Sequence, residues 1–554
     1  MTEAPDDGAE VIREIIAATD PVLLVVGGAG TGKTTTAAAA VRAELVRGDE
    51  LEVSSPSGNR RPSRALFLSF SRAAVAQTLV RSKDILGAYE DRVEITTYHA
   101  FAWDLLQKFG NSVGLLDPEL TSPAEAKILP SHNRILYDDL IPFALRICSI
   151  PAIAAHLQSR WSIIVCDEFQ DTTISQFRLL EMIRGQARLL LLGDLNQCIY
   201  EAMPGMVGVG QPRLADALQL DGARQINMAA LSHRDPTGVL PAAADAIRRR
   251  DFTDPAIATA LSSGRLRIEA GLDPELEADS VASHVQCLLG EGNETVAVFS
   301  HHVDSTTDLS DRLRERGVEH EIIGLSDCLT AALQAQYAMI SFSLGKAEWE
   351  YVLQRLAVFV TSSVRGKTAP MLAYHLLKPD SPSVSSILRT RLDSLRRQLL
   401  ESDARDAVNV GISAHGAIGL TRGARHWRQA SQMLAPLVAQ AMRRERDTLA
   451  ALDLLERTVA ERRTGLLTNL ADGDEIPVQL MGLYQAKGRE AEATVVVLRE
   501  SDYFGNEYYP YPNGSRLLYV DLTRARKTTV LLLFGTPRQL VSPLAELGEF
   551  AKDA

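Results

Sequence analysis

The sequence predicts an α/β protein built on parallel β-sheets, with a long helical segment in its second half. In the first third, short apolar runs alternate with helical stretches, as parallel strands joined by crossover helices do. Similar apolar runs return near residue 295 and near the C-terminus, whereas residues 326–470 carry long helical patterns with few strand signals. At 554 residues the chain exceeds the size of one hydrophobic core, so we expect several domains.

Composition limits the class of protein. The hydrophobic share of 46% and charged share of 23% are ordinary for a globular chain, and no apolar run reaches membrane-spanning length. The acidic N-terminus lacks the pattern of a secretory signal, and the five cysteines have no metal-binding spacing. We therefore expect a cytoplasmic protein with no membrane partner. The net charge of −12 argues mildly against indiscriminate nucleic-acid binding, and the locally basic helical segments fit either a DNA-facing patch or solvated helix faces.

The strands follow in order. Five are expected in the first third, beginning near residues 22, 65, 93, 162 and 188. Two more flank the helix expected at DLSDRLRERG, and three are expected in VQLMGLYQAKG, ATVVVLRES and TTVLLLFG near the C-terminus.

A glycine-rich loop follows the first apolar run and opens a helix. Its letters, GGAGTGKT at residues 27–34, match the spacing of a phosphate-binding loop, whose glycines let backbone N–H groups turn toward phosphates. Lys33 would reach the outer phosphates, and the Thr34 hydroxyl would bind Mg²⁺. A glycine-rich turn without a ligand is the weaker alternative. The predicted nucleotide-binding residues here are Gly28, Ala29, Gly30, Thr31, Gly32, Lys33, Thr34 and Thr35.

Two adjacent carboxylates, Asp167 and Glu168, stand at the end of the apolar run that begins at Ser162. Asp167 could hold the Mg²⁺ shell, and Glu168 is placed to take a proton from the attacking water. Such a pair is often only a solvated strand end. Together with the upstream loop, it predicts a nucleoside triphosphatase.

An ordered series of motifs resembles the UvrD/Rep group of superfamily 1 helicases. The series runs from residue 27 to residue 527 and comprises GGAGTGKT, FLSFSRAAVAQ at 67, ITTYHAFA at 95, DEFQDT at 167, LLGDLNQCIY at 191, LSHRDPTG at 231, LMGLYQAKGREAEATVVVL at 480 and LLYVDLTRARK at 517. The resemblance implies two RecA-like domains that close on ATP, each with a helical accessory insertion.

The resemblance also implies roles for particular residues. Gln170 and Gln197 would sense the γ-phosphate, and Arg234 and Arg524 would form a cationic clamp on it. Glu490 would contact the ribose.

Four further residues fall where family members touch single-stranded DNA, partly by stacking bases on rings: Phe70, Thr97, His99 and Tyr200.

The implied domain order has six parts. They are residues 1–105 and 156–235 for the first RecA-like domain, 106–155 for a compact insertion, 236–325 and 471–554 for the second RecA-like domain, and 326–470 for a helical insertion.

Several positions depart from the family pattern. Ile12 stands where a glutamine usually reads adenine, Thr35 replaces an arginine, and His233 replaces a base-stacking tyrosine. Residues 201–204 read EAMP where glycine, tryptophan and arginine are usual, and residues 484–485 read Tyr-Gln in place of His-Ser. The ATP-hydrolysis pattern is thus nearly complete, while the strand-gripping pattern is altered.

Two functions are therefore weighed. The first is a Mg²⁺- and ATP-dependent translocase or helicase that moves 3′ to 5′ on single-stranded or tailed duplex DNA. The second is a DNA-stimulated regulatory ATPase subunit that works with a nuclease partner, as in anti-phage systems, and unwinds little by itself.

Overall fold

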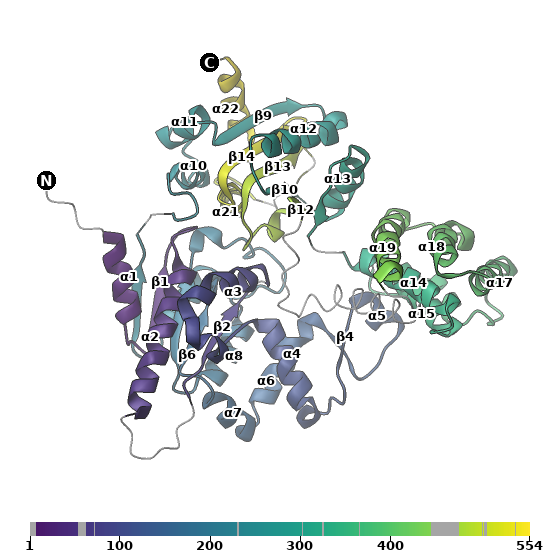
Figure 1. Cartoon of the computed structure of the whole chain (residues 1–554), viewed down its shortest axis with the longest axis horizontal. Helices are drawn as coiled ribbons and strands as arrows, with labels where there is room; N and C mark the ends of the chain where they lie inside the picture. The colour runs from purple at the N-terminus through teal and green to yellow at the C-terminus, as the bar shows by residue number, and fades with distance from the viewer. Residues whose placement is uncertain are drawn as a thin grey trace. The chain divides into compact units, whose positions relative to one another are not determined.

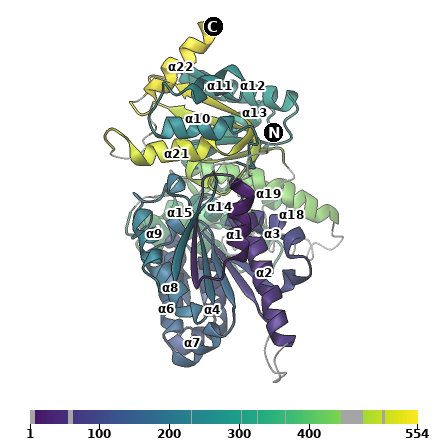
Figure 2. The ribbon, with the colours of Figure 1, turned by 90° about the vertical axis from the view of Figure 1, so that its left-hand side faces the viewer.

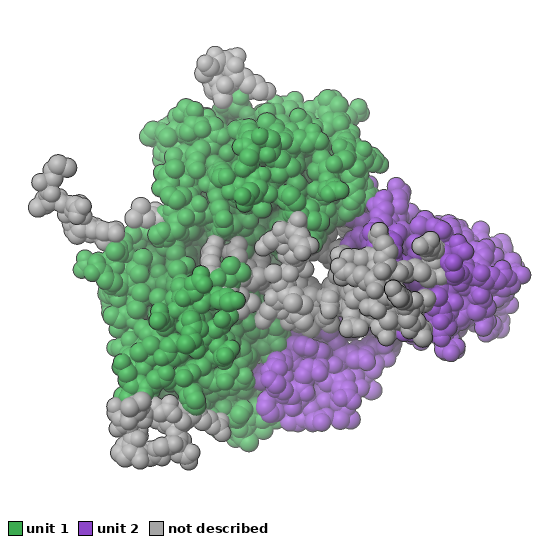
Figure 3. Space-filling view, viewed as in Figure 1, with its two compact units in different colours: residues 1–102, 144–324, 469–554 green, residues 103–143, 325–468 purple. Residues whose placement is uncertain are grey.

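The computed structural model describes residues 7–53, 62–70, 72–229, 232–301, 303–323, 326–364, 366–444, 476–500, 502, 507–537 and 539–553. The chain forms two compact units (Figure 3). Unit 1 comprises residues 1–102, 144–324 and 469–554, and unit 2 comprises residues 103–143 and 325–468.

Unit 1 contains a first sheet of six parallel strands in the order β3-β2-β6-β7-β1-β8. Figure 1 labels β1, β2 and β6 of this sheet. The strands are β1 (Val22–Val26), β2 (Ala65–Ser69), β3 (Val93–Thr97), β6 (Ile163–Cys166), β7 (Arg188–Gly193) and β8 (Ala223–Asn227). Most residues of β1, β2, β6 and β7 are buried, because helices cover both faces of a parallel sheet. Their continuous apolar runs follow from that double burial.

Helices flank this sheet on both sides (Figure 2). On one face lie α1 (Asp7–Ala17), α2 (Lys33–Val53) and α3 (Arg72–Leu86), whose apolar side chains share a core with those of the strands. On the other lie α8 (Ile174–Arg184) and α9 (Gln211–Leu218). Thr173 begins α8 with a capping box in which its hydroxyl accepts from the Gln176 N–H and the Gln176 side chain accepts from the Thr173 N–H. The α4 helix (Tyr98–Phe109) follows β3.

Unit 1 also contains a second six-stranded parallel sheet, ordered β11-β12-β10-β13-β14-β9. Its strands are β9 (Leu266–Leu272), β10 (Val296–Ser300), β11 (Glu321–Ile322), β12 (Val478–Gly482), β13 (Ala491–Arg499) and β14 (Ala525–Phe534). One core cluster joins this sheet to α12 (Glu277–Gly290) and α13 (Val303–Glu315). Another joins it to α10 (Val239–Arg248), α11 (Pro255–Ser262), α21 (Pro512–Leu522) and α22 (Ser542–Asp553). This second cluster also includes Ala29 and Ile199 from the first sheet's loops.

The predicted fold class is confirmed, since the chain holds two parallel sheets covered by helices. The strand predictions missed β8 and β9, which are edge strands of the two sheets. Polar and charged residues interrupt both segments, ARQIN at 223–227 and LRIEAGL at 266–272, so neither forms a continuous apolar run.

Unit 2 is mainly helical. Its helices α14 (Asp327–Ser343), α15 (Trp349–Ser362), α17 (Ser386–Leu400), α18 (Ala404–Ile418) and α19 (Ala424–Arg444) share one core with α5 (Pro123–Ile128) and α16 (Met371–Leu377). The buried Arg355 donates to Glu125 at 2.9 Å. The two segments of chain that form unit 2 are therefore joined by a common core and an ion pair. A short parallel pair, β4 (Glu119–Thr121) and β5 (Arg134–Leu136), also belongs to this unit.

Part of the predicted helical insertion, residues 445–470, lies outside the described residues. The remaining helices are α6 (Leu140–Cys148) and α7 (Pro151–Gln158). Within the described ranges, no single helix is long and apolar enough to cross a membrane. One pair of helices, residues 137–148 and 151–158, is long and apolar enough when taken together, but it is bent by 98°.

Candidate nucleotide and nucleic-acid site

A cavity of about 710 Å³ opens beside the phosphate loop of unit 1. Its position follows from strand register: Val26 at the end of β1 pairs with Gly193 at the end of β7, and β6 ends next to β7. Parallel strands thus deliver the loop, the acids and the residues after β7 to one edge of the sheet. Of the predicted residues, the cavity is lined by Gly30, Thr31, Gly32, Lys33, Thr34, Thr35, Asp167, Glu168, Gln197, Arg234, Glu490 and Arg524.

Two glycines of the loop adopt a backbone conformation that other residues rarely adopt. Gly30 has φ 75° and Gly32 has φ 85°. A Cβ atom on Gly30 would lie 2.4 Å from the Ser232 Oγ and 3.0 Å from the Arg234 Cβ. Glycine at position 30 therefore lets the segment that carries Arg234 approach the loop closely.

Lys33 and Thr34 occupy the first turn of α2. The Lys33 ammonium donates to the carbonyls of Gly27 at 2.6 Å and Gly28 at 2.9 Å, so it lies folded against its own loop. The Thr34 hydroxyl donates to Asp167 Oδ2 at 2.9 Å. A hydroxyl beside a carboxylate is a set of oxygen donors that suits Mg²⁺.

The neighbouring acids have opposite pKa shifts. Burial, reinforced by the charge of Glu168, raises the pKa of Asp167. Burial also acts to raise the pKa of Glu168, but the charges of Lys487 and Lys33 outweigh it and hold that pKa below its usual value. Glu168 has φ 54°, a strained backbone position for a residue with a side chain. The site thus keeps Glu168 ionised, as a proton acceptor must be.

Gln197 and Arg524 meet across the two sheets. The Arg524 guanidinium donates to Gln197 Oε1 at 3.0 Å and to the Val520 carbonyl at 2.8 Å, and Gln197 in turn donates to Asp194 Oδ2 at 2.7 Å. Burial, with the nearby charge of Arg234, lowers the pKa of Arg524 to about 10. Arg524 therefore stays cationic at neutral pH.

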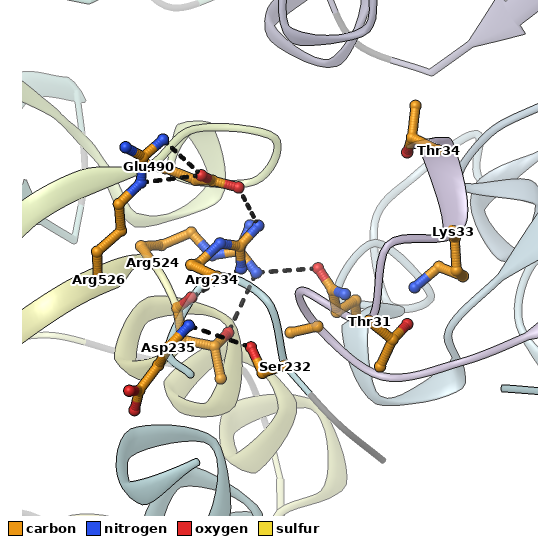
Figure 4. A network of polar contacts seen from close by, with 12 residues as sticks. Thr31, Lys33, Thr34, Ser232, Arg234, Asp235, Glu490, Arg524 and Arg526 are labelled. Carbon is orange, nitrogen blue, oxygen red and sulfur yellow. Dashed lines mark hydrogen bonds and ion pairs between the residues drawn. The ribbon is translucent and has the colours of Figure 1, made fainter. Parts of the chain in front are cut away.

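Arg234 and Glu490 form a second link, in which Glu490 lies between two arginines (Figure 4). Arg234 donates to Glu490 at 2.5 Å and to the Thr523 carbonyl at 2.8 Å. Arg526 donates to the other Glu490 oxygen at 3.1 Å. In this structure Glu490, which the resemblance assigns to the ribose, is thus engaged by two arginines.

Gln170 is separated from the cavity. It is fully buried, donates to Glu168 Oε2 at 2.6 Å and accepts from the Asp194 N–H at 2.9 Å. Its contacts orient Glu168 rather than face a nucleotide directly. Gly28 and Ala29 also lie outside the cavity lining.

Two of the residues predicted to contact nucleic acid form a row of rings with a third. The Phe70 and Tyr200 ring centroids are 4.9 Å apart, and those of Tyr200 and Tyr484 are 6.3 Å apart. The Tyr200 hydroxyl donates to the Tyr484 carbonyl at 3.0 Å. We call Phe70, Tyr200 and Tyr484 the aromatic row. Tyr484, a departure from the family pattern, is thus part of it.

The other two predicted contacts differ in exposure. Thr97 is buried, and its hydroxyl accepts from the Ala100 N–H at 3.1 Å at the start of α4. His99 is half-buried. Thr97 therefore has a local structural role in this conformation.

Lys487 is a functional candidate that the sequence analysis missed. Its side chain is 3% exposed, forms ion pairs with Asp171 and, at 3.5 Å, with Glu168, and donates to the Gln197 carbonyl at 2.6 Å. Its ammonium also lies 5.5 Å from the Tyr200 ring centroid. Burial raises the pKa of Asp171 to about 7 despite this lysine. The sequence carried no clear signal for it, because Lys487 lies beyond the end of β12 at Gly482 and is separated from that strand by the turn Leu483–Gln485.

A further departure makes a contact between the sheets. Glu201 stands where the family pattern has glycine, and it accepts from Arg516 of α21 at 2.5 Å. Other cavity-lining residues that the sequence analysis did not assign to the site include Arg526 and Ile16.

The fold and this cavity define the class: a nucleotide-binding protein with two RecA-like parallel sheets, whose charged side chains meet at one phosphate loop. Residues 12–203 match the model of a family described as an AAA domain. The ATP-dependent DNA helicase PcrA of Staphylococcus aureus is 22% identical over 34% of this chain. The exonuclease/helicase subunit RexA of Lactococcus lactis is 35% identical over 13% of it. These matches and the ordered motifs support the assignment of the chain to the UvrD-like superfamily 1 helicases.

The matches are partial. They cover 33% of the S. aureus relative and 6% of the L. lactis relative, so the chain matches about a third or less of their length. A solved structure of S. cerevisiae Dbp5 bound to RNA and ADP BeF3 aligns with 100% of this chain and 89% of that one, at a TM-score of 0.39 and 10% identity.

Proposed function

We propose that this protein hydrolyses ATP with Mg²⁺ and uses the energy to move along single-stranded DNA, unwinding duplex in the 3′ to 5′ direction. The observation that carries the proposal is the convergence on one cavity of Lys33, Glu168 and Gln197 from the first sheet, Arg524 from the second, and Arg234 from the segment that joins β8 to α10. Phosphoryl transfer requires this arrangement, since its catalysis consists mostly of positioning and charge stabilisation.

At the phosphate loop, Thr34 and Asp167 would hold Mg²⁺, which supplies charge neutralisation of the phosphates when bound. Lys33 would leave the Gly27 and Gly28 carbonyls for the outer phosphates, replacing two neutral acceptors with charged ones. Glu168, held ionised by Lys487 and Lys33, would accept the proton of the attacking water.

Arg524, just before β14, and Arg234, between β8 and α10, would supply the charge that stabilises the transferring phosphate. Arg524 is already fixed by Gln197 and the Val520 carbonyl, so little reorganisation is needed. Arg234 is paired with Glu490, and Arg526 shares that carboxylate. Movement of Arg234 to phosphate would therefore leave Glu490 still paired with Arg526.

Coupling to DNA would run through Lys487. This lysine pairs with Glu168 and lies beside Tyr200. A DNA base stacked on the aromatic row would therefore change the surroundings of the cation that pairs with Glu168, the proposed proton acceptor. The DNA partner, the 3′ to 5′ polarity and a cytoplasmic location are parts of the proposal.

A strand-displacement assay tests it. Duplexes with a 3′ tail or a 5′ tail are incubated with the protein, ATP and Mg²⁺, with Lys33→Ala as the blank. Unwinding of the 3′-tailed duplex alone is expected. Unwinding of the 5′-tailed duplex alone would reverse the proposed polarity.

A second function is favoured by one observation: residue 201, where the family pattern has glycine, is a glutamate that pairs with Arg516. This salt bridge lies at the first of the positions 201–204, where the family pattern has residues that grip successive DNA bases. The chain would then be a DNA-stimulated regulatory ATPase that works with a separate nuclease, a pairing consistent with the name of the L. lactis relative. DNA-stimulated hydrolysis without displacement of either duplex would favour this second function.

A further inference from the structure

One end of the nucleotide cavity is apolar. Ile12 and Ile16 lie one turn apart on the same face of α1, are half-buried and line the cavity. Ala39 of α2 and Ile85 of α3 line it as well. Because α2 begins at Lys33, Ala39 lies more than a turn away from the phosphate loop, so this end suits the part of a nucleotide beyond its phosphates.

The charged lining is concentrated elsewhere. Thr34 bonds to Asp167, Arg524 to Gln197, and Arg234 to Glu490, so these groups hold one another around the loop. Among the described residues that α1, α2 and α3 contribute beyond the loop and Thr34, the lining has no amide or carboxylate side chain. Its polar side chains are the hydroxyls of Thr35, Thr36 and Thr78.

A flat ring also lines this cavity. The backbone N–H of His233 donates to the Gly30 carbonyl at 2.7 Å, and a Cβ on Gly32 would lie 3.1 Å from the His233 ring atom Cδ2. The imidazole therefore lies against the loop and lines the cavity, so a base bound there would stack on it. Stacking does not distinguish one base from another, because every base has a π-face.

Reading a base requires fixed donors and acceptors. A glutamine side chain presents one of each, whereas isoleucine presents neither, and a threonine hydroxyl rotates to donate or accept as its partner demands. Adenine has an amino group, a hydrogen-bond donor, at the ring position where guanine has a carbonyl oxygen, an acceptor. Walls made by Ile12, Ile16 and His233 would therefore contact a base by apolar packing and stacking, neither of which distinguishes these two purines.

We propose that Ile12 and Ile16 make this a site for nucleoside triphosphates of any base, so that GTP, CTP and UTP serve as substrates alongside ATP. The inference rests on the proposed hydrolysis at the same cavity. Apolar pockets separate similar ligands by roughly 10- to 200-fold, while sites that hydrogen-bond a group reject its absence by about 10⁴-fold or more. We expect kcat/KM values for the four triphosphates to differ by no more than about 200-fold.

The test measures kcat/KM for ATP, GTP, CTP and UTP on the full chain with Mg²⁺, and displacement of a fluorescent ATP analogue by each. Comparable constants and comparable displacement support the inference. A preference for ATP of about 10⁴-fold or more, the discrimination of a site that hydrogen-bonds the base, would overturn it while leaving the hydrolase function intact. Displacement by ATP alone, with no hydrolysis of any triphosphate, would overturn both.

A reversal variant makes the test independent of the absolute rates. Ile12→Gln restores a donor and an acceptor at a half-buried position, and we expect it to raise the ATP-to-GTP ratio of kcat/KM by about fivefold or more, the worth of one net hydrogen bond. Ile12→Met is the matched control, because it keeps an apolar side chain of similar size, and its ratio should equal that of the unaltered chain. Equal ratios in Ile12→Gln and Ile12→Met would contradict a base-contacting role for residue 12.

Discussion

The nucleotide cavity and the aromatic row differ in how their polar groups are used. In the cavity, Thr34, Glu168 and Arg524 converge from two sheets on one space. In the row, the Tyr200 hydroxyl is bonded to the Tyr484 carbonyl, and Phe70 packs against the Tyr200 ring. The first region is arranged for a ligand, whereas in the second the rings are engaged with one another. Hydrolysis should therefore tolerate substitution less well than strand binding does.

The largest effect is expected for Glu168→Gln. Loss of the proton acceptor should lower kcat by about 10²- to 10⁴-fold, because positioned general bases contribute that much. ATP binding, measured by fluorescence, should change little, since the amide keeps the shape of the side chain. If binding is lost instead, Glu168 contributes to the affinity for ATP and is not simply the base.

The second-largest effect is expected for Arg524→Ala. Removing one preorganised cation from the transferring phosphate should lower kcat by roughly 10²- to 10³-fold, as with other charge-stabilising groups. Arg524→Lys keeps the charge but loses the simultaneous bonds to Gln197 and the Val520 carbonyl, so it should recover only part of the rate. Steady-state hydrolysis measures both, and a loss under fivefold in Arg524→Ala would show that the clamp is misassigned.

Lys487→Met should affect stability as well as turnover. It leaves the buried Asp171 without its cation, and breaking a buried pair typically costs about 3–5 kcal/mol of unfolding free energy. Denaturant unfolding measures the change. In the double variant Lys487→Met/Asp171→Leu the buried carboxylate is gone, so much of the stability should return. If the double variant is as unstable as Lys487→Met, the lost stability does not come from the unpaired Asp171 carboxylate.

The smallest effect should come from the aromatic row. Tyr200→Ala should weaken single-stranded DNA binding by about tenfold, the contribution of one base stacked on a ring. Tyr200→Phe keeps the ring and removes only the bond to the Tyr484 carbonyl, so its affinity should stay within about twofold. Fluorescence anisotropy with a labelled oligonucleotide distinguishes them. Equal losses in both variants would assign the effect to the hydroxyl rather than to stacking.

The sequence predicted the loop and the acids well because both depend on local order. GGAGTGKT and DEFQDT each follow an apolar strand, and parallel pairing brings those strand ends together. Arg234 and Arg524 came from the resemblance, since spacing along the chain does not show that residues so far apart line the same cavity. The structure brings both to it.

Other features depended on tertiary packing. Lys487 looks like any lysine in the sequence, and its burial beside Asp171 and Glu168 is set by the fold of both sheets. The Arg526 contact to Glu490 and the joining of two chain segments in unit 2 are likewise long-range. Edge strands β8 and β9 were missed because polar and charged residues break the apolar pattern.

The central claim is that the protein hydrolyses ATP at this cavity and that DNA raises the rate of hydrolysis. The most direct measurement is the steady-state ATPase rate with and without single-stranded DNA, using Glu168→Gln to measure contaminating activity. We predict hydrolysis that exceeds this blank at least about a hundredfold and rises several-fold with DNA. A rate equal to that of Glu168→Gln, or one that no nucleic acid changes, would contradict the account.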